Sequence, residues 1–272
     1  MTSPTQITVS QLSRLIGTPD VPVLIDVCID DDFSKDPRLI PTSLRCPHTR
    51  IGDHVESLQG RRVVVICQKG KKLSEGAAAI MRAKGVNAET LEGGIFAWRD
   101  GKEPLVPAAK VPQRNSEGCT LWVTRQRPKI DRIACPWLIR RFIDPTAQFL
   151  FVAPSEVEDV ADKFGAIPFD VEGVFWSHRD DLCTFDVMID EFALDTEPLQ
   201  RLATIVRGAD TNRHELAPEA AGLLAASLGL SRMYRDDLAQ LDAGMIIYDA
   251  FYRWARDASS EGHDWPAALN RT

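Results

Sequence analysis

The sequence lacks the features that mark membrane, secreted or fibrous proteins. No run of apolar residues approaches the roughly 18 that a transmembrane helix needs, and the start MTSPTQITVSQLSRLIG lacks the cationic and apolar regions of a secretory signal. Cysteine is scarce, with 6 residues in 272, so a disulfide framework is neither needed nor indicated. We therefore expect a cytoplasmic protein whose cysteines are thiols and which has no membrane partner.

An excess of positive charge is also missing. The 32 basic and 39 acidic residues give a net charge of −7, which disfavours nucleic acid as a partner. The distribution is uneven, because residues 110–141 carry 8 basic and 2 acidic groups whereas residues 142–272 carry 10 and 24. The basic segment is either a solvated, arginine-rich connector or a site for an anion.

The length favours two globular domains, the first over residues 1–105. Here short apolar runs at 21–27, 61–67 and 87–94 alternate with a helical pattern at 73–85, which predicts an α/β fold with a largely parallel sheet. The run from Val63 to Ile66 is continuously apolar, as expected of a central strand covered on both faces.

The second half reads differently. Residues 106–118 contain prolines without apolar periodicity and are predicted to be a linker. The second domain, 119–258, is predicted to be helix-rich α+β, with a tail at 259–272. Its expected strands are 119–125 and 147–152, and its expected helices include 184–192, 197–209, 217–229 and 234–257. Two local expectations are that Pro136 stands in the first turn of a helix and that Ser155 and Glu158 form a capping box.

Cys67 ends the central strand and precedes a short basic loop before the next helix. Such a loop turns backbone N–H groups inward, and the helix dipole adds positive charge, so the pattern predicts an anion nest that stabilises a thiolate or a bound sulfur anion. Gly70 lets the backbone turn. The substrate-binding residues expected in this loop are Gln68, Lys69, Gly70, Lys71 and Lys72.

Three ordered segments, VLIDV (23–27), CQKGKK (67–72) and LEGGIFAWRDGKEP (91–104), resemble the signatures of a rhodanese domain. The resemblance implies a thiosulfate sulfurtransferase in which Cys67 carries sulfane sulfur as a persulfide, with no cofactor required. The partners it implies are a small sulfur donor and a thiol or anion acceptor. Lys72 stands where the family usually has arginine, and so does Cys28 after the first motif. A recognition module with an inert, buried Cys67 is the alternative.

The basic segment holds the second set of candidates. Arg132, Pro136 and Arg140 fall at helical intervals beside Cys135, and arginine forks at that spacing suit a doubly charged oxyanion. Ion pairs with the acidic body are the competing interpretation.

A third cluster is His178 with Cys183 and Asp186, a mixture of imidazole, thiolate and carboxylate that suits a transition metal. The spacing matches no standard zinc pattern, so an ordinary hydrogen-bonded histidine is the alternative. Asp210 and His214 are either further ligands or a surface pair.

Several ordered blocks between about 120 and 255, among them KIDRIACPWLIRRFIDP and CTFDVMIDEF, resemble the C-terminal domain of the ChrB type of chromate-resistance proteins. The resemblance implies a role in chromate resistance, in some members as a sensor or regulator.

The leading hypothesis is a two-domain sulfurtransferase whose second domain binds an oxyanion, a metal or a thiol-bearing acceptor, with Cys135 or Cys183 as a candidate acceptor. Two other hypotheses stay open. One is an oxyanion- or metal-responsive regulator without turnover, and the other is a metal-dependent redox protein.

Overall fold

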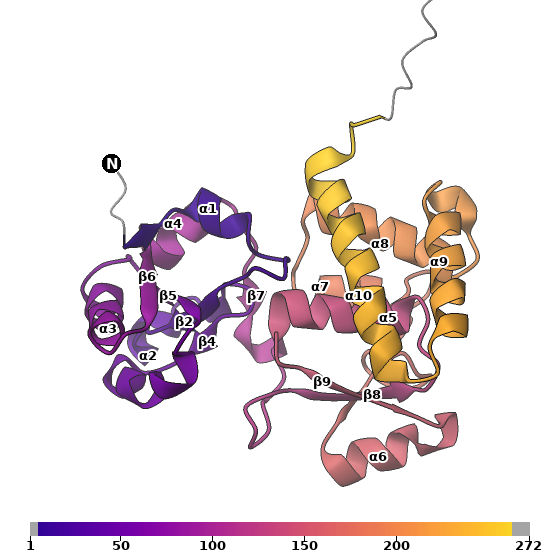
Figure 1. Ribbon diagram of the computed structural model, residues 1–272, viewed down its shortest axis with the longest axis horizontal. Helices are drawn as coiled ribbons and strands as arrows, with labels where there is room; N and C mark the ends of the chain where they lie inside the picture. The colour runs from indigo at the N-terminus through magenta and orange to yellow at the C-terminus, as the bar shows by residue number, and fades with distance from the viewer. Residues whose placement is uncertain (1–4, 263–272) are drawn as a thin grey trace, which may run out of the picture.

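The computed structural model describes residues 5–262, and its first domain is built on a five-stranded parallel sheet (Figure 1). The strands lie in the order β1 (Gln6–Ile7), β6 (Asn87–Leu91), β5 (Arg62–Ile66), β2 (Val23–Asp26) and β4 (Leu44–Arg45). The central strand β5 is buried from Val63 to Ile66, as predicted from its unbroken apolar run. The parallel α/β fold of this domain is therefore confirmed.

Short helices surround this sheet. They are α1 (Val9–Ser13), α2 (Asp30–Phe33), α3 (Lys72–Ala83) and α4 (Gly94–Asp100), with 3₁₀ turns η1 (His48–His54) and η2 (Glu56–Leu58). The helix α3 begins one residue before the predicted range and lies on the side of the domain away from the second one (Figure 1).

The predicted linker starts with ordered structure. Its first residues form β7 (Val106–Pro107), which pairs antiparallel with β3 (Arg38–Leu39), and the turn η3 (Ala108–Lys110) follows. Val106 is buried, so this end of the segment belongs to the packing of the first domain.

The second domain opens with a βαβαβ unit. The strands β8 (Leu121–Arg125), β9 (Gln148–Val152) and β10 (Ile167–Pro168) are all parallel, in the order β10-β8-β9. The connections are α5 (Asp131–Leu138) with the π-helical η4 (Ile139–Ile143), then η5 (Pro154–Glu156) with α6 (Val157–Phe164). Figure 1 shows α5 and α6 on opposite faces of this small sheet.

The remaining chain is helical, which confirms a helix-rich second part. The elements are α7 (Thr184–Glu191), α8 (Glu197–Asp210), η6 (His214–Leu216), α9 (Ala220–Met233), α10 (Asp237–Arg253) and the π-helical η7 (Trp254–Ala258). Most of the predicted tail, residues 263–272, lies outside the described residues.

Two local predictions were wrong. Pro136 lies inside α5 instead of in its first turn, and the helix continues beyond it as a π-helix. Ser155 does not cap α6, since its hydroxyl donates to Glu156 within the preceding 3₁₀ turn. Gly165, with φ of +63°, does end α6 as expected.

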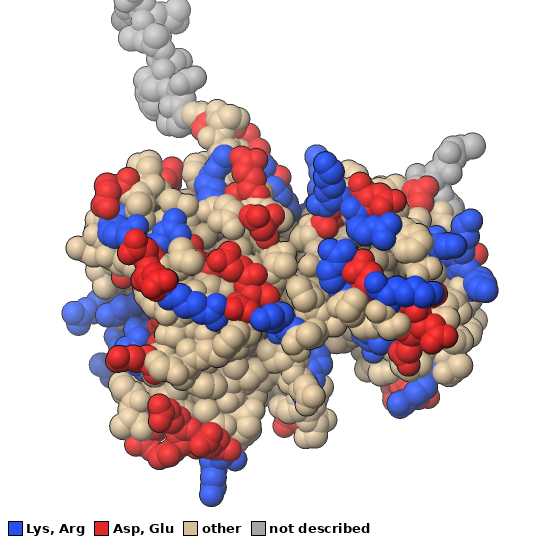
Figure 2. All heavy atoms as spheres, turned by 180° about the vertical axis from the view of Figure 1, so that it is seen from behind, with Lys and Arg blue, Asp and Glu red and all other residues tan. Residues whose placement is uncertain are grey.

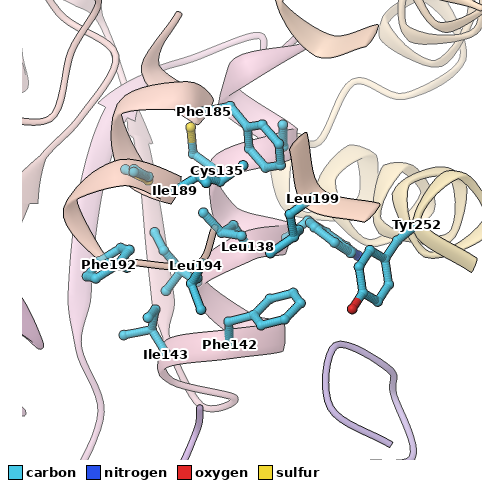
Figure 3. Close-up of a cluster of buried hydrophobic side chains, with 14 of the residues drawn as sticks. Cys135, Leu138, Phe142, Ile143, Phe185, Ile189, Phe192, Leu194, Leu199 and Tyr252 are labelled. Atoms are coloured by element: carbon cyan, nitrogen blue, oxygen red, sulfur yellow. The ribbon is translucent and has the colours of Figure 1, made fainter. Parts of the chain in front are cut away.

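One apolar cluster runs through both domains. Phe142 packs edge-on against Tyr252 and Trp137, with ring centroids 5.6 and 5.8 Å apart. At Gly17 of the first domain, an added Cβ would lie 2.6 Å from atoms of both Phe142 and Tyr252, so the two domains meet in close contact. Figure 3 shows the centre of this cluster, with Cys135 among Phe185 and Ile189.

The surface carries no large patch of one charge on the face seen in Figure 2, where acidic and basic side chains interleave over both lobes. Within residues 5–262, no helix combines the length and apolar character needed to cross a membrane.

Candidate functional site

Cys67 lies at the carboxyl end of β5, where the chain turns into the loop before α3. The residue is 4% exposed. Its Sγ is 3.1 Å from Oγ of Ser74, a buried residue in the first turns of α3. Ser74 Oγ in turn donates to the carbonyl of Lys71 at 3.1 Å. While it donates to Lys71, this hydroxyl can accept from a Cys67 thiol, and it can donate to a Cys67 thiolate only by turning its one proton away from the Lys71 carbonyl.

The loop is held in shape by the Gly93-Gly94 turn. A Cβ on Gly94 would lie 2.1 Å from the carbonyl oxygen of Cys67, and one on Gly70 would lie 2.4 Å from the carbonyl oxygen of Leu91. Both glycines have positive φ, so two backbones meet here where no side chain fits. The two glycine motifs of the sequence thus form a single contact.

Two hydrogen bonds orient the peptide planes of the loop. The N–H groups of Ile95 and Phe96 donate to the carbonyls of Cys67 and Gln68, each at 3.1 Å. Because C=O and N–H point in opposite directions across a trans peptide, the N–H groups of Gln68 and Lys69 face away from α4. Lys69, Lys71 and Lys72 are exposed around the same loop.

Cys28 follows β2 and lies near Cys67 in the same buried cluster. Its N–H donates to Asp26 Oδ1 at 2.9 Å. Burial, together with the Asp26 carboxyl group, raises the pKa of the Cys28 thiol far above its usual range. Cys28 is therefore held as a thiol at neutral pH and is a poor nucleophile.

The basic segment does not share a cleft with Cys67. Arg114, Arg140 and Arg141 line a cavity of about 240 Å³ together with Val23 and Arg61, which lie at the amino ends of β2 and β5. Cys67 follows the carboxyl end of β5. The arginines and the sulfur are thus at opposite edges of one sheet.

The second-domain candidates do not form one oxyanion site. Arg132 Nε is 3.3 Å from Asp170 Oδ2, whereas Arg140 Nη1 is 3.4 Å from Asp242 Oδ1 and its Nε donates to the carbonyl of Ala147. Cys135 is fully buried, and that burial raises the pKa of its thiol. An acceptor role for Cys135 would require the core to open.

The three residues predicted to hold a metal, His178, Cys183 and Asp186, do not form one group. Cys183 is the N-cap of α7, where its N–H donates to Asp186 Oδ2, and Asp186 Oδ1 accepts from Arg207 at 2.8 Å. Cys183 is fully buried, which raises the pKa of its thiol. His178 lies instead beside Asp131, Asp170 and Asp210, and the first two form with it a group whose candidate ligand atoms are within 4.8 Å of one another.

Sequence reasoning missed three residues of these sites. Asp131 and Asp170 gave no signal because no spacing along the chain links either of them to His178, although both follow strands of the second sheet. Ser74 stands seven residues after Cys67, and only the helical start of α3 returns it to the sulfur.

Two family matches divide the chain where the structure does. Residues 8–100 match the family described as rhodanese-like domain, and residues 122–255 match the one described as ChrB, C-terminal domain. Protein ChrB of Cupriavidus metallidurans is 35% identical over 153 residues, which cover 55% of this chain and 46% of that protein. The chain therefore matches slightly less than half the length of this curated relative.

Solved structures resemble the first domain. A rhodanese-related protein from Thermoplasma volcanium is 22% identical and covers 37% of this chain and 96% of its own, with a TM-score of 0.33. A rhodanese-like domain protein from Staphylococcus aureus is 26% identical and covers 35% and 90%, with a TM-score of 0.31. The thiosulfate sulfurtransferase from Pseudomonas aeruginosa is 24% identical and covers 37% and 19%, with a TM-score of 0.32.

Proposed function

The chain joins a rhodanese-like domain to a ChrB C-terminal domain, and from this premise we propose that it is a sulfurtransferase in which Cys67 carries sulfane sulfur as a persulfide. The observation that carries the proposal is the placement of Cys67 Sγ at the carboxyl end of β5, 3.1 Å from the Ser74 hydroxyl and inside a glycine-held basic loop.

The proposed reaction has two balanced steps. The Cys67 thiolate attacks the outer sulfur of thiosulfate, the S–S bond of thiosulfate breaks, and sulfite leaves with the bonding electron pair. An acceptor such as cyanide then attacks the outer sulfur of the Cys67 persulfide, which releases thiocyanate and restores the thiolate. The two steps return Cys67 to its starting thiolate, so the transfer needs no external oxidant.

The loop supports both anionic states of Cys67. The N–H groups of Gln68 and Lys69 face away from α4, and the N-terminus of α3 brings partial positive charge to the same place. The ammonium groups of Lys69, Lys71 and Lys72 add charge at the entrance. The Ser74 hydroxyl can donate to the thiolate and so acts as a positioning residue.

Two features shape the proposed specificity. With 4% of Cys67 exposed, a small donor reaches the sulfur more easily than a bulky one. Lys72 offers a point charge in place of the planar fork of arginine, which weakens bidentate recognition of a sulfonate group. We therefore expect weaker binding of thiosulfate than an arginine at this position would give. Lys72→Arg should lower KM for thiosulfate more than it raises kcat.

The test is thiocyanate formation from thiosulfate and cyanide by the full chain, with mass spectrometry of the intact protein after thiosulfate alone. Wild type should gain one sulfur atom, Cys67→Ser should lose both the activity and the added sulfur, and the matched control Cys46→Ser should keep both. Ser74→Ala should lower kcat about tenfold, the effect of losing one hydrogen bond to a charged group. Persulfide on another cysteine, or none with any sulfur donor, would remove the proposal.

We also propose that the chain acts in chromate resistance, because its second domain matches that of ChrB. The test is complementation of a chromate-sensitive host by wild type and by Cys67→Ser. Full complementation by Cys67→Ser, together with absent sulfur transfer, would instead favour a regulator that responds to chromate or sulfate without turnover.

A further inference from the structure

The second sheet has a topological switch point, and acidic residues lie at it. From β8 the chain crosses α5 to β9 on one side, and then crosses α6 to β10 on the other side of β8. In such open parallel sheets, ligands bind outside the carboxyl ends of the strands where the winding reverses. Asp131 begins the helix after β8, and Asp170 follows β10.

Three carboxylates converge on one imidazole nitrogen at this point. His178 Nε2 is 3.5 Å from Asp131 Oδ2, 3.5 Å from Asp170 Oδ1 and 3.3 Å from Asp210 Oδ2. Nε2 carries at most one N–H, which can donate to only one of these three oxygens. Even when His178 is protonated, the other two carboxylates therefore lie close together without a hydrogen bond from it.

Asp131 supplies an independent observation. Its side chain is 1% exposed, and its Oδ2 accepts from the N–H of Thr184 at 2.6 Å. Among residues 5–262, its buried Oδ1 accepts no hydrogen bond of good geometry, and the buried Cys183 thiol is a neighbour that interacts with this carboxyl group. An unpartnered, buried carboxylate oxygen is costly unless a proton or a cation compensates it.

The spacing of the donor atoms suits a metal ion. Bonds of about 2.1 Å at a tetrahedral angle would separate neighbouring ligand atoms by about 3.4 Å. The carboxylate oxygens lie 3.3–3.5 Å from His178 Nε2, and the candidate atoms of Asp131, Asp170 and His178 all lie within 4.8 Å of one another. Arg132 and Arg125 both contact Asp170 Oδ2, at 3.3 Å each, and Thr184 Oγ1 donates to Asp170 Oδ1 at 2.9 Å, so this carboxylate is held in place with Oδ1 beside His178.

We propose that Asp131, Asp170 and His178, with Asp210 beside His178, form a binding site for one divalent first-row transition-metal ion in the ChrB C-terminal domain. Imidazole combined with carboxylates favours Mn²⁺, Fe²⁺ or Zn²⁺ over Mg²⁺. The site is open on one side, because His178 is 42% exposed and lines, with Asp170 and Arg125, a cavity of about 520 Å³. The ion therefore keeps a position that solvent or a small anion can reach.

The experiment uses the full chain, stripped with a chelator and dialysed, and titrated with Mn²⁺ alone or Zn²⁺ alone. Binding is followed by calorimetry and, for Mn²⁺, by loss of the free-ion EPR signal. One ion should bind per chain. His178→Ala and Asp210→Asn should weaken binding by about tenfold or more, while Asp181→Asn, an exposed acid three residues from His178, should bind as wild type does.

Circular dichroism spectra of the variants separate lost binding from lost folding, and His178→Ala and Asp210→Asn are chosen because neither residue is fully buried. Sulfur transfer by Cys67 serves as an independent readout that these variants should leave unchanged. Wild type that binds neither ion, or variants that bind as tightly as wild type, would overturn the proposal.

Discussion

The contact between Gly94 and the Cys67 loop predicts that Gly94→Ala damages both stability and sulfur chemistry. The new Cβ would lie 2.1 Å from Cys67 O and 2.4 Å from Gly70 N, both backbone atoms that cannot rotate away. A φ of +62° costs an alanine about 1–2 kcal/mol. Relieving the overlap by moving the loop adds about 1–3 kcal/mol, which brings the expected loss of unfolding free energy to about 2–5 kcal/mol.

Gly60→Ala is the matched control, since Gly60 has φ of +73° and, among the described residues, an added Cβ meets no atom within 4 Å. It should cost only the conformational part, about 1–2 kcal/mol. Urea denaturation followed by tryptophan fluorescence gives both values, and the rate of Cys67 alkylation by iodoacetamide reports the loop. Equal losses in the two variants, or an unchanged alkylation rate in Gly94→Ala, would refute the idea that the glycine pair shapes the loop.

Two further predictions concern the second domain. Phe142→Ala should lower the unfolding free energy by about 3–5 kcal/mol, because it empties a buried site between Trp137, Tyr252 and the first domain. The exposed Phe164→Ala should stay within about 0.5 kcal/mol of wild type in the same urea titration, and similar losses in both would contradict this packing. In metal-free protein, hydrogen-bonding contact of Nε2 with the Asp170 or Asp210 carboxylate raises the pKa of His178 to about 10, from 6.5. The protonated ring then stabilises the fold fully below pH 6.5 and loses this effect as the pH rises through 10. The difference in urea midpoint between wild type and His178→Gln should therefore shrink over that window, and a difference that grows would contradict the assignment.

Local pattern was enough for the first domain. The unbroken apolar run at Val63–Ile66, the cysteine that follows it and the glycine pair after β6 predicted the parallel sheet and the loop after β5, while Cys67 as the nucleophile stays a prediction. The sequence reveals these features because each depends on residues that are close in the chain. The strand, the turn and the start of the next helix all fall within about ten residues. The expectation that Pro136 begins a helix was wrong because tertiary packing of α5 in the core outweighs the local cost of a proline.

The group around His178 in the second domain could be predicted only in part from the sequence. His178 and Asp210 were selected from the sequence, but their partners Asp131 and Asp170 were not, and Cys183 and Asp186 were placed with them instead. Spacing along the chain does not report which strand ends lie side by side, and β10 is too short to show a periodic pattern.

The sequence by itself determined the α/β character of the first domain, the helix-rich second part and the position of Cys67 after a central strand, because these follow from periodicity and from residues close in the chain. Only the tertiary structure decided that Cys67 and the basic segment lie at opposite edges of one sheet, and that three carboxylates surround His178. Both depend on strand order and on contacts between residues far apart in the chain, which only the folded backbone brings together and which a local sequence pattern cannot report.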